Sequence, residues 1–208
     1  MKPNDVKVSK ETISLLFTCN MSVREKLKPL VVSHSENPRC FKSINKANLP
    51  VYYRHNRKAW MDSCIFKEWL IKWNKQLKAE NRKVLLFLDN FSGHKNDPSC
   101  ENIKTVYFPV NSKSVLQPLD QGIIHSFKVK NRKDVAREIL YAIEQGSDIP
   151  TIDILSSIYK IKRVCDGVSP STIRNCFRKA GYNREFLFNT LENEEEDQYR
   201  EIATFEKN

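Results

Sequence analysis

Residues 83–89 (KVLLFLD) form a continuous apolar run that ends in a carboxylate, Asp89. A run of this kind is typical of a strand that is buried on both faces of a sheet. Ligands of open α/β sheets lie beyond the carboxyl ends of the strands, so Asp89 is placed where a functional site would form. The alternative is that Asp89 and Asn90 only make a turn after the strand.

Patterns on both sides of this strand predict an α/β domain. β-branched and apolar stretches predict further strands at residues 11–20 (ETISLLFTCN), 28–33, 51–54 and 103–108, with a loop at 38–49. Helical spacing and capping residues predict helices at residues 62–80, 120–145, 151–165 and 171–180. The first helix has one apolar face, better explained as core than as a ligand site, formed by Ile65, Phe66, Trp69, Leu70, Trp73 and Leu77. We therefore expect a core over residues 1–145, a helical extension over 146–191 and an acidic tail over 192–208.

The chain of 208 residues carries a formal net charge of +10, which is unevenly distributed. Residues 192–208 hold seven acidic and two basic residues, so residues 1–191 carry +15. A basic body indicates a polyanionic partner, although a lysine-rich soluble protein would have the same composition. We expect the tail to be solvated, with a protein-interaction segment as the alternative. No apolar run approaches the ~20 residues of a membrane span, and the cysteines lack the spacing of a zinc site or disulfide framework.

Asp120 is a second carboxylate with a favourable position, because it begins the helix predicted over residues 120–145. By itself, Asp120 could simply be an N-cap. Together with Asp89, it supplies the hard oxygen ligands that Mg²⁺ or Mn²⁺ takes in proteins that act on phosphodiesters. We expect both acids to be metal ligands and catalytic residues, with no small-molecule cofactor.

Two motifs at this spacing resemble a known family. LDNxxxH, within residues 86–94 (LFLDNFSGH), is followed by LQPLDQG at residues 116–122, and thirty residues separate Asp89 from Asp120. These segments resemble the DDE transposases of the Tigger, pogo and jerky group, and the resemblance extends over residues 8–182. The resemblance implies a domain with a ribonuclease H-like mixed sheet and flanking helices. Domains of this kind cut and join DNA with three acids and two divalent metals. Asp89 matches the second acid and Asp120 the third, and the supporting positions that orient ligands or DNA match Asn90, His94, Gln117 and Gln121.

The resemblance also implies a first acid, on a central strand that precedes residues 11–20. Before Asp89 the only aspartates are Asp5 and Asp62. Asp62 is expected to cap a helix, and Asp5 lies after the position of the family's first acid. We therefore expect a sheet without its first strand and a DNA-binding domain whose strand cleavage is impaired. The alternatives are an active Mg²⁺-dependent endonuclease or transposase, if a longer form or partner supplies the missing acid, and a truncated product without a function of its own.

Basic residues gather on two of the predicted helices and are candidate DNA contacts. The candidates are Lys128, Lys130, Arg132, Lys133 and Arg137 in the helix after Asp120, and Arg174, Arg178 and Lys179 in the last predicted helix. A solvated helix face is the alternative explanation. A DNA partner would place the protein in the nucleus, and no feature of the sequence indicates an oligomeric state.

Overall fold

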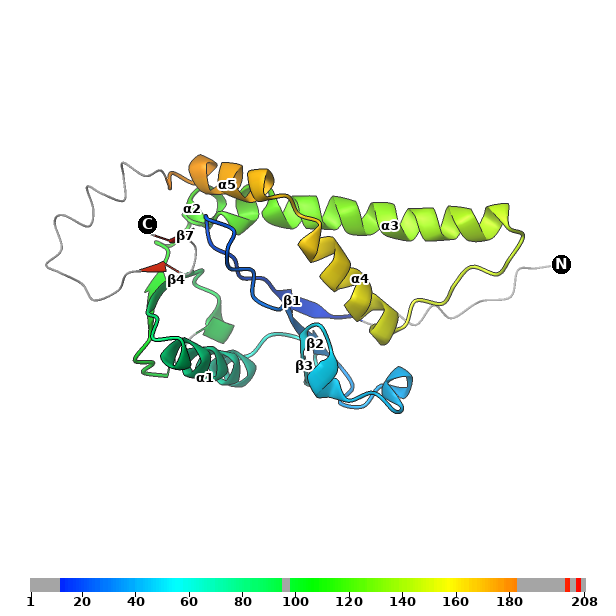
Figure 1. Cartoon of the computed structure of the whole chain (residues 1–208), viewed down its shortest axis with the longest axis horizontal. Helices are drawn as coiled ribbons and strands as arrows, with labels where there is room; N and C mark the ends of the chain where they lie inside the picture. The colour runs from blue at the N-terminus through cyan, green and yellow to red at the C-terminus, as the bar shows by residue number, and fades with distance from the viewer. Residues whose placement is uncertain (1–11, 95–97, 183–200, 203–204, 207–208) are drawn as a thin grey trace, which may run out of the picture.

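A computed structural model describes residues 12–94, 98–182, 201–202 and 205–206 and shows an α/β molecule, as the sequence predicts (Figure 1). The strands are β1 (Ser14–Leu16), β2 (Leu30–Ser33), β3 (Tyr52–His55), β4 (Val84–Leu88), β5 (Ile103–Tyr107), β6 (Glu201–Ile202) and β7 (Phe205–Glu206). The helices are α1 (Ser63–Ala79), α2 (Lys113–Leu116), α3 (Ile124–Glu144), α4 (Ile154–Asp166) and α5 (Pro170–Lys179). The predicted loop at residues 38–49 contains two 3₁₀ turns, η1 (Arg39–Phe41) and η2 (Lys46–Asn48).

The described strands lie in two sheets, whereas the sequence predicts a single mixed sheet. One sheet has the order β1-β2-β3, in which β2 is antiparallel to β1 and parallel to β3. The other has the order β5-β4-β6-β7, in which β4 is parallel to both of its neighbours. Because no described strand joins β1 to β4, the ribonuclease H-like arrangement itself stays a prediction.

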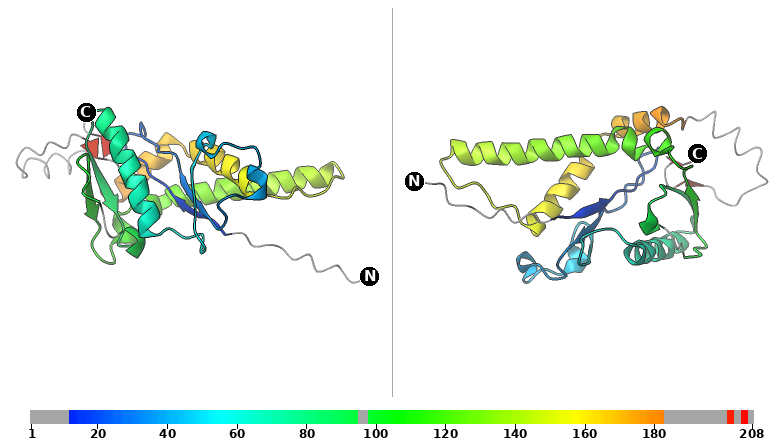
Figure 2. Two further views of the ribbon diagram at one scale, coloured as in Figure 1. Left: turned by 90° about the horizontal axis from the view of Figure 1, so that it is seen from below. Right: turned by 180° about the vertical axis from the view of Figure 1, so that it is seen from behind.

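Both sheets nevertheless pack against the same helices. Helix α1 lies on one side of the molecule and helices α3, α4 and α5 lie on the other (Figures 1 and 2), and residues of β2 and β4 share a hydrophobic cluster with α1. The side chains of Val84, Leu86 and Leu88 pack with those of α1 in one hydrophobic cluster. Leu85 and Phe87 pack on the opposite side, against a cluster that includes residues of α4 and α5. Strand β4 is therefore covered on both faces, as its continuous apolar run predicts.

The strand predicted over residues 11–20 is shorter than expected. Its ladder with β2 ends at the pair Leu16 and Leu30, and Pro29, which has no backbone N–H group, precedes β2. Beyond the ladder, an isolated antiparallel bridge between Cys19 and Lys26 closes the connection. Residues 17–19 consequently run beside the centre of the molecule without belonging to a described strand.

Helix α1 confirms the prediction for residues 62–80. The carboxylate of Asp62 accepts a hydrogen bond of 2.9 Å from the backbone N–H of Ile65, as an N-cap does. The six apolar residues that the helical spacing selected are all buried. Asp62 is therefore used as a cap, and Asp5 lies outside the described residues.

The prediction that Asp120 begins the long helix is wrong. Helix α3 begins at Ile124, after a five-residue π-helical turn, η4 (Leu119–Ile123), and Asp120 lies inside this turn. The break occurs at Gly122, whose φ of 148° is a conformation that favours glycine. A Cβ atom there would also lie 3.1 Å from the Sγ of Cys176 in α5. The Asp120 carboxylate does not cap a helix, so it is available for other contacts.

Helices α4 and α5 lie close to their predicted positions and are capped by Asp153 and Ser169. Both contribute to the cluster that contains Cys19 and Val31 of β2, although the domain boundaries at 145 and 191 stay predictions. Most of the acidic tail lies outside the described residues, and its parts at 201–202 and 205–206 form β6 and β7. Within the described ranges, no helix has the length and apolar character needed to cross a bilayer.

Candidate active site

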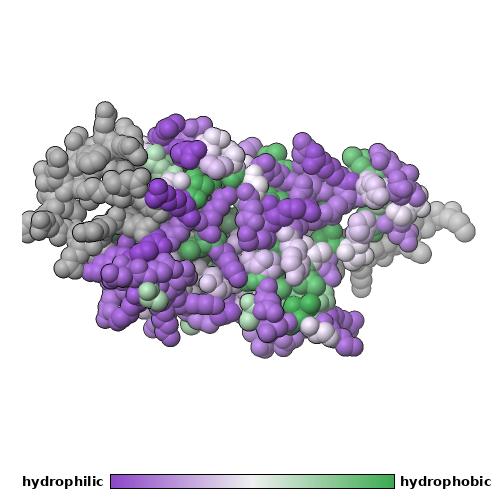
Figure 3. All heavy atoms as spheres, in the orientation of Figure 1, coloured by the Kyte–Doolittle hydropathy of each residue, from purple (hydrophilic) through white to green (hydrophobic). Residues whose placement is uncertain are grey.

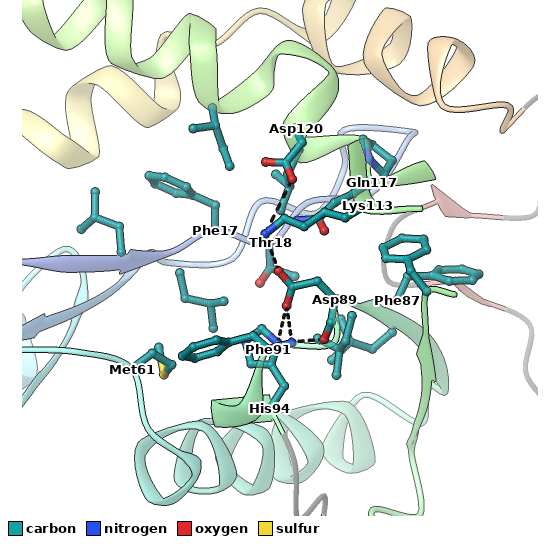
Figure 4. Close-up of a pocket in the computed structure, with 18 of the residues that line it drawn as sticks. Phe17, Thr18, Met61, Phe87, Asp89, Phe91, His94, Lys113, Gln117 and Asp120 are labelled. Carbon is teal, nitrogen blue, oxygen red and sulfur yellow. Dashed lines mark hydrogen bonds and ion pairs between the residues drawn. The ribbon is translucent and has the colours of Figure 1, made fainter. Parts of the chain in front are cut away.

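A cavity of about 450 Å³ lies between β1 with the residues after it, α1 and the carboxyl end of β4 (Figure 4). Asp89, which directly follows β4, and Asp120 in η4 both line it. Most of the other lining side chains are apolar, and they come from β1, α1, β4, η4, α3, α5 and the segments that connect these elements. The two acids predicted from the sequence are therefore brought together in one largely apolar cavity.

The side chain of Lys113, at the first position of α2, connects the two acids (Figure 4). Its Nζ donates a hydrogen bond of 2.8 Å to the Oδ2 of Asp89 and lies 3.8 Å from the Oδ2 of Asp120. The ion pair raises the pKa of Lys113, and the hydrogen bond with Asp89 is the main cause. The two carboxylates thus converge on one cation, which here is an ammonium group.

The other carboxylate oxygen of Asp89 contacts the side chain of His94. The Nδ1 of His94 lies 2.8 Å from the Oδ1 of Asp89, and the imidazole is buried between the rings of Phe66 and Phe91. This hydrogen bond is the largest of the effects that hold the pKa of Asp89 well below its usual range, and the bond from Lys113 adds to it. Asp89 is therefore ionised at neutral pH, with both of its oxygens in contact with nitrogen donors.

Asn90 and Gln121, which were also predicted to support the acids, do not point into the cavity. The Asn90 amide donates to the carbonyl oxygen of Phe108, so it joins the ends of β4 and β5. The Gln121 amide donates to the carbonyl oxygens of Ser114 and Val115, at 2.6 and 2.9 Å, and so holds α2 against η4. Neither Asn90 nor Gln121 lines the cavity, and both stabilise the elements that present the acids and Lys113.

Gln117 does line the cavity, beside Lys113 and Asp120 (Figure 4). Its Oε1 atom is buried and accepts no hydrogen bond from the described residues. A buried acceptor without a donor costs about 1–3 kcal/mol. The site therefore offers one acceptor that a bound molecule could use.

The donor set fits one divalent ion in part. Asp89 and Asp120 already share one cation, and Mg²⁺ commonly takes one or two carboxylates while it keeps several water molecules. Among the residues that the structure describes, no three His, Cys, Asp or Glu side chains group as a ligand set. The two acids are thus suited to an ion that water and a phosphate would also coordinate, rather than to a closed protein site.

Lys113 is the residue of the site that the sequence patterns did not identify. It lies seven residues before Asp120 in a polar segment, and neither motif includes it. Its contact with Asp89 spans 24 residues, so no helical or strand periodicity could reveal it.

The predicted DNA contacts are all exposed, and they lie on helices α3 and α5. Two of the three acids of α3 instead pair with α4: the Nζ of Lys160 lies 2.6 Å from Glu138, and Arg163 lies 3.1 Å from Asp134. Asp134 and Glu138 thus face α4, whereas the candidate basic residues of α3 are exposed to solvent. On the side of the molecule that faces the viewer in Figure 1, hydrophilic residues cover most of the described surface, with hydrophobic residues between them (Figure 3).

Carboxylates brought together at the end of a strand are also what proteins that act on phosphodiesters use to hold divalent metals. The chain belongs to the DDE superfamily endonuclease family, which matches residues 10–177. This membership confirms the resemblance to transposase-derived proteins that the two motifs indicate.

Several proteins are similar to the chain over most of its length. Tigger transposable element-derived protein 4 of Mus musculus is 32% identical over 176 residues, which cover 85% of this chain and 34% of that protein. ARS-binding protein 1 of Schizosaccharomyces pombe is 31% identical over 184 residues, or 83% and 35% of the two chains. Major centromere autoantigen B of Homo sapiens is 26% identical over 174 residues, or 83% and 28%. The chain spans about a third of the length of these relatives, and no solved structure matches it.

Proposed function

We propose that this domain binds DNA through its basic helices and that, on its own, it cleaves DNA poorly or not at all. The observation that carries the proposal is the separation of charge on α3: Asp134 and Glu138 pair with α4, while the basic side chains of α3 remain exposed. The basic residues of α5 add to this charge, because α5 packs against η4 at the start of α3 (Figure 1). A DNA partner places the protein in the nucleus, and the name of ARS-binding protein 1 supports a binding role.

We expect weak cleavage because only two acids, Asp89 and Asp120, converge among the described residues, whereas the family uses three. Asp89 and Asp120 converge, whereas the described aspartate before them, Asp62, is committed to the cap of α1. Phosphodiester cleavage needs a very large reduction of the barrier, which rests on charges held in fixed positions. Two carboxylates would hold Mg²⁺ or Mn²⁺ weakly, and the bound ion would supply positive charge to phosphate oxygens.

An active metal-dependent endonuclease is the second candidate, and the cavity favours it. β1 is the edge strand of its sheet, and the cavity extends from β1 to β4 and reaches both acids. A strand that entered there from a longer form of the chain, or from a partner, would lie beside Asp89. It could supply a third acid and a donor for the Oε1 of Gln117.

The binding proposal is tested by fluorescence anisotropy with a labelled duplex at several salt concentrations. For about four phosphate contacts, the affinity should fall on the order of 100-fold between about 50 and about 200 mM salt, because bound counterions are released. The double variant Lys128→Gln/Lys133→Gln should bind more weakly, whereas Lys67→Gln/Lys75→Gln, which removes the same charge from the exposed side of α1, should bind like the wild type.

Two results would contradict the proposal. Binding that is unchanged across this salt range, or equal losses in the two double variants, would show that α3 does not form the DNA contact. If the chain is folded but binds no DNA even at low salt, the result would support the remaining alternative, a truncated product without a function of its own.

A further inference from the structure

Lys113 lies where a metal ion would have to bind. Its ammonium contacts the Oδ2 atoms of both Asp89 and Asp120, the only two acids that converge on the cavity among the described residues. The contact to Asp89, at 2.8 Å, is as short as a charge-assisted hydrogen bond. A divalent ion that bridged the two acids would need these same oxygens.

We propose that Lys113 is a resident counter-cation of the acid pair, which a divalent ion displaces when it binds. The inference rests on the proposed metal site at Asp89 and Asp120. Lys113 then weakens metal binding by competition, and it keeps the two negative charges paired while the ion is absent.

Competition follows from the charges, because an ammonium and a divalent ion repel each other strongly at the few ångströms that the acids allow. The Lys113 side chain is 54% exposed, so it can swing away from the acids into water as a charged group, and it gives up its ion pair with Asp89 when it does so. Asp89 cannot follow it, because its side chain is 14% exposed and its Oδ1 is held by His94. The acids therefore stay in place, and only the lysine exchanges with the metal.

The proposal is tested by Mn²⁺ titration of the folded chain without DNA, with free Mn²⁺ measured by electron paramagnetic resonance. Lys113→Gln removes the competing charge, and we expect its Kd to fall on the order of 10-fold. Lys113→Arg keeps the charge and should stay near the wild type. Lys67→Gln removes an equal charge from the exposed side of α1 and should change the Kd by less than about two-fold, because salt screens a distant charge. Asp89→Asn should bind Mn²⁺ much more weakly than the wild type.

These measurements distinguish the metal site at Asp89 and Asp120 from the counter-cation role of Lys113. If the wild type binds Mn²⁺, Asp89→Asn does not, and Lys113→Gln binds no more tightly than the wild type, the metal site stands and the role of Lys113 is wrong. Equal gains in Lys113→Gln and Lys67→Gln would also overturn it, since a general charge effect would explain both. If neither the wild type nor Lys113→Gln binds more tightly than Asp89→Asn, the metal site and the counter-cation role both fall.

Discussion

Replacing Asp89 with Asn removes the negative charge that contacts both His94 and Lys113 in the site. The carboxylate makes two contacts of 2.8 Å, to the Nδ1 of His94 and to the Nζ of Lys113. A hydrogen bond to a charged group contributes about 1.5–3 kcal/mol. The pair with Lys113 is half exposed, so it contributes no more than about 1 kcal/mol. Since the amide of Asn can still accept one bond, we expect Asp89→Asn to lower the free energy of unfolding at pH 7 by about 1.5–3 kcal/mol.

The effect should depend on pH with a definite sign. The pKa of Asp89 in the folded state lies below the unfolded value of about 3.9, mainly because of the bond with His94. Its stabilisation is thus fully present above pH ~4 and is lost as the pH falls toward the folded pKa. The difference between wild type and Asp89→Asn should therefore shrink when the pH is lowered from about 7 to about 3.

Urea unfolding of the two proteins at these pH values, followed by circular dichroism, measures this difference. Asp148→Asn is the matched control, because Asp148 is exposed between α3 and α4 and its replacement should change stability little at either pH. A loss in Asp89→Asn that is equal at both pH values, or greater stability of that variant at pH 7, would refute the electrostatic account of the site.

Three further predictions concern the elements around the site. Gly122→Ala should lower the free energy of unfolding by about 1–3 kcal/mol, because alanine is strained at a φ of 148°; a thermal melt that matches the wild type would contradict the structure of η4. Asp62→Ala should cost about 1 kcal/mol through loss of the α1 cap, measured by urea unfolding, with no change in Mn²⁺ affinity if Asp62 is not a metal ligand. Lys133→Gln should reduce the salt slope of DNA binding by about 0.9 if the residue contacts a phosphate, whereas Lys67→Gln should leave the slope unchanged.

The sequence correctly predicted the elements in which apolar residues recur at the regular spacing of a helix or form the continuous run of a buried strand. The apolar spacing of α1 identified its buried face and its cap, and the run of β4 identified a strand covered on both sides. The motifs also identified Asp89 and Asp120, which the structure brings together through Lys113. In each case the signal lies within a short segment of the chain.

Features that depend on distant contacts could not be predicted in this way. The start of α3 is shifted past Asp120 because Gly122 breaks the helix where α5 packs against it, and α5 lies about 50 residues further along the chain. Lys113 contacts Asp89 only because the tertiary fold brings the start of α2 close to the end of β4. The division of the strands into two sheets likewise depends on pairing between segments that no local period describes.

The central claim is that the two acids of this domain do not by themselves support DNA cleavage. It is tested most directly by incubating supercoiled plasmid DNA with the purified chain and Mg²⁺ or Mn²⁺, beside Asp89→Asn and Asp120→Asn. We predict that the wild type nicks the plasmid no faster than either variant does. Metal-dependent nicking by the wild type that is lost in both variants would contradict the claim and establish an active endonuclease.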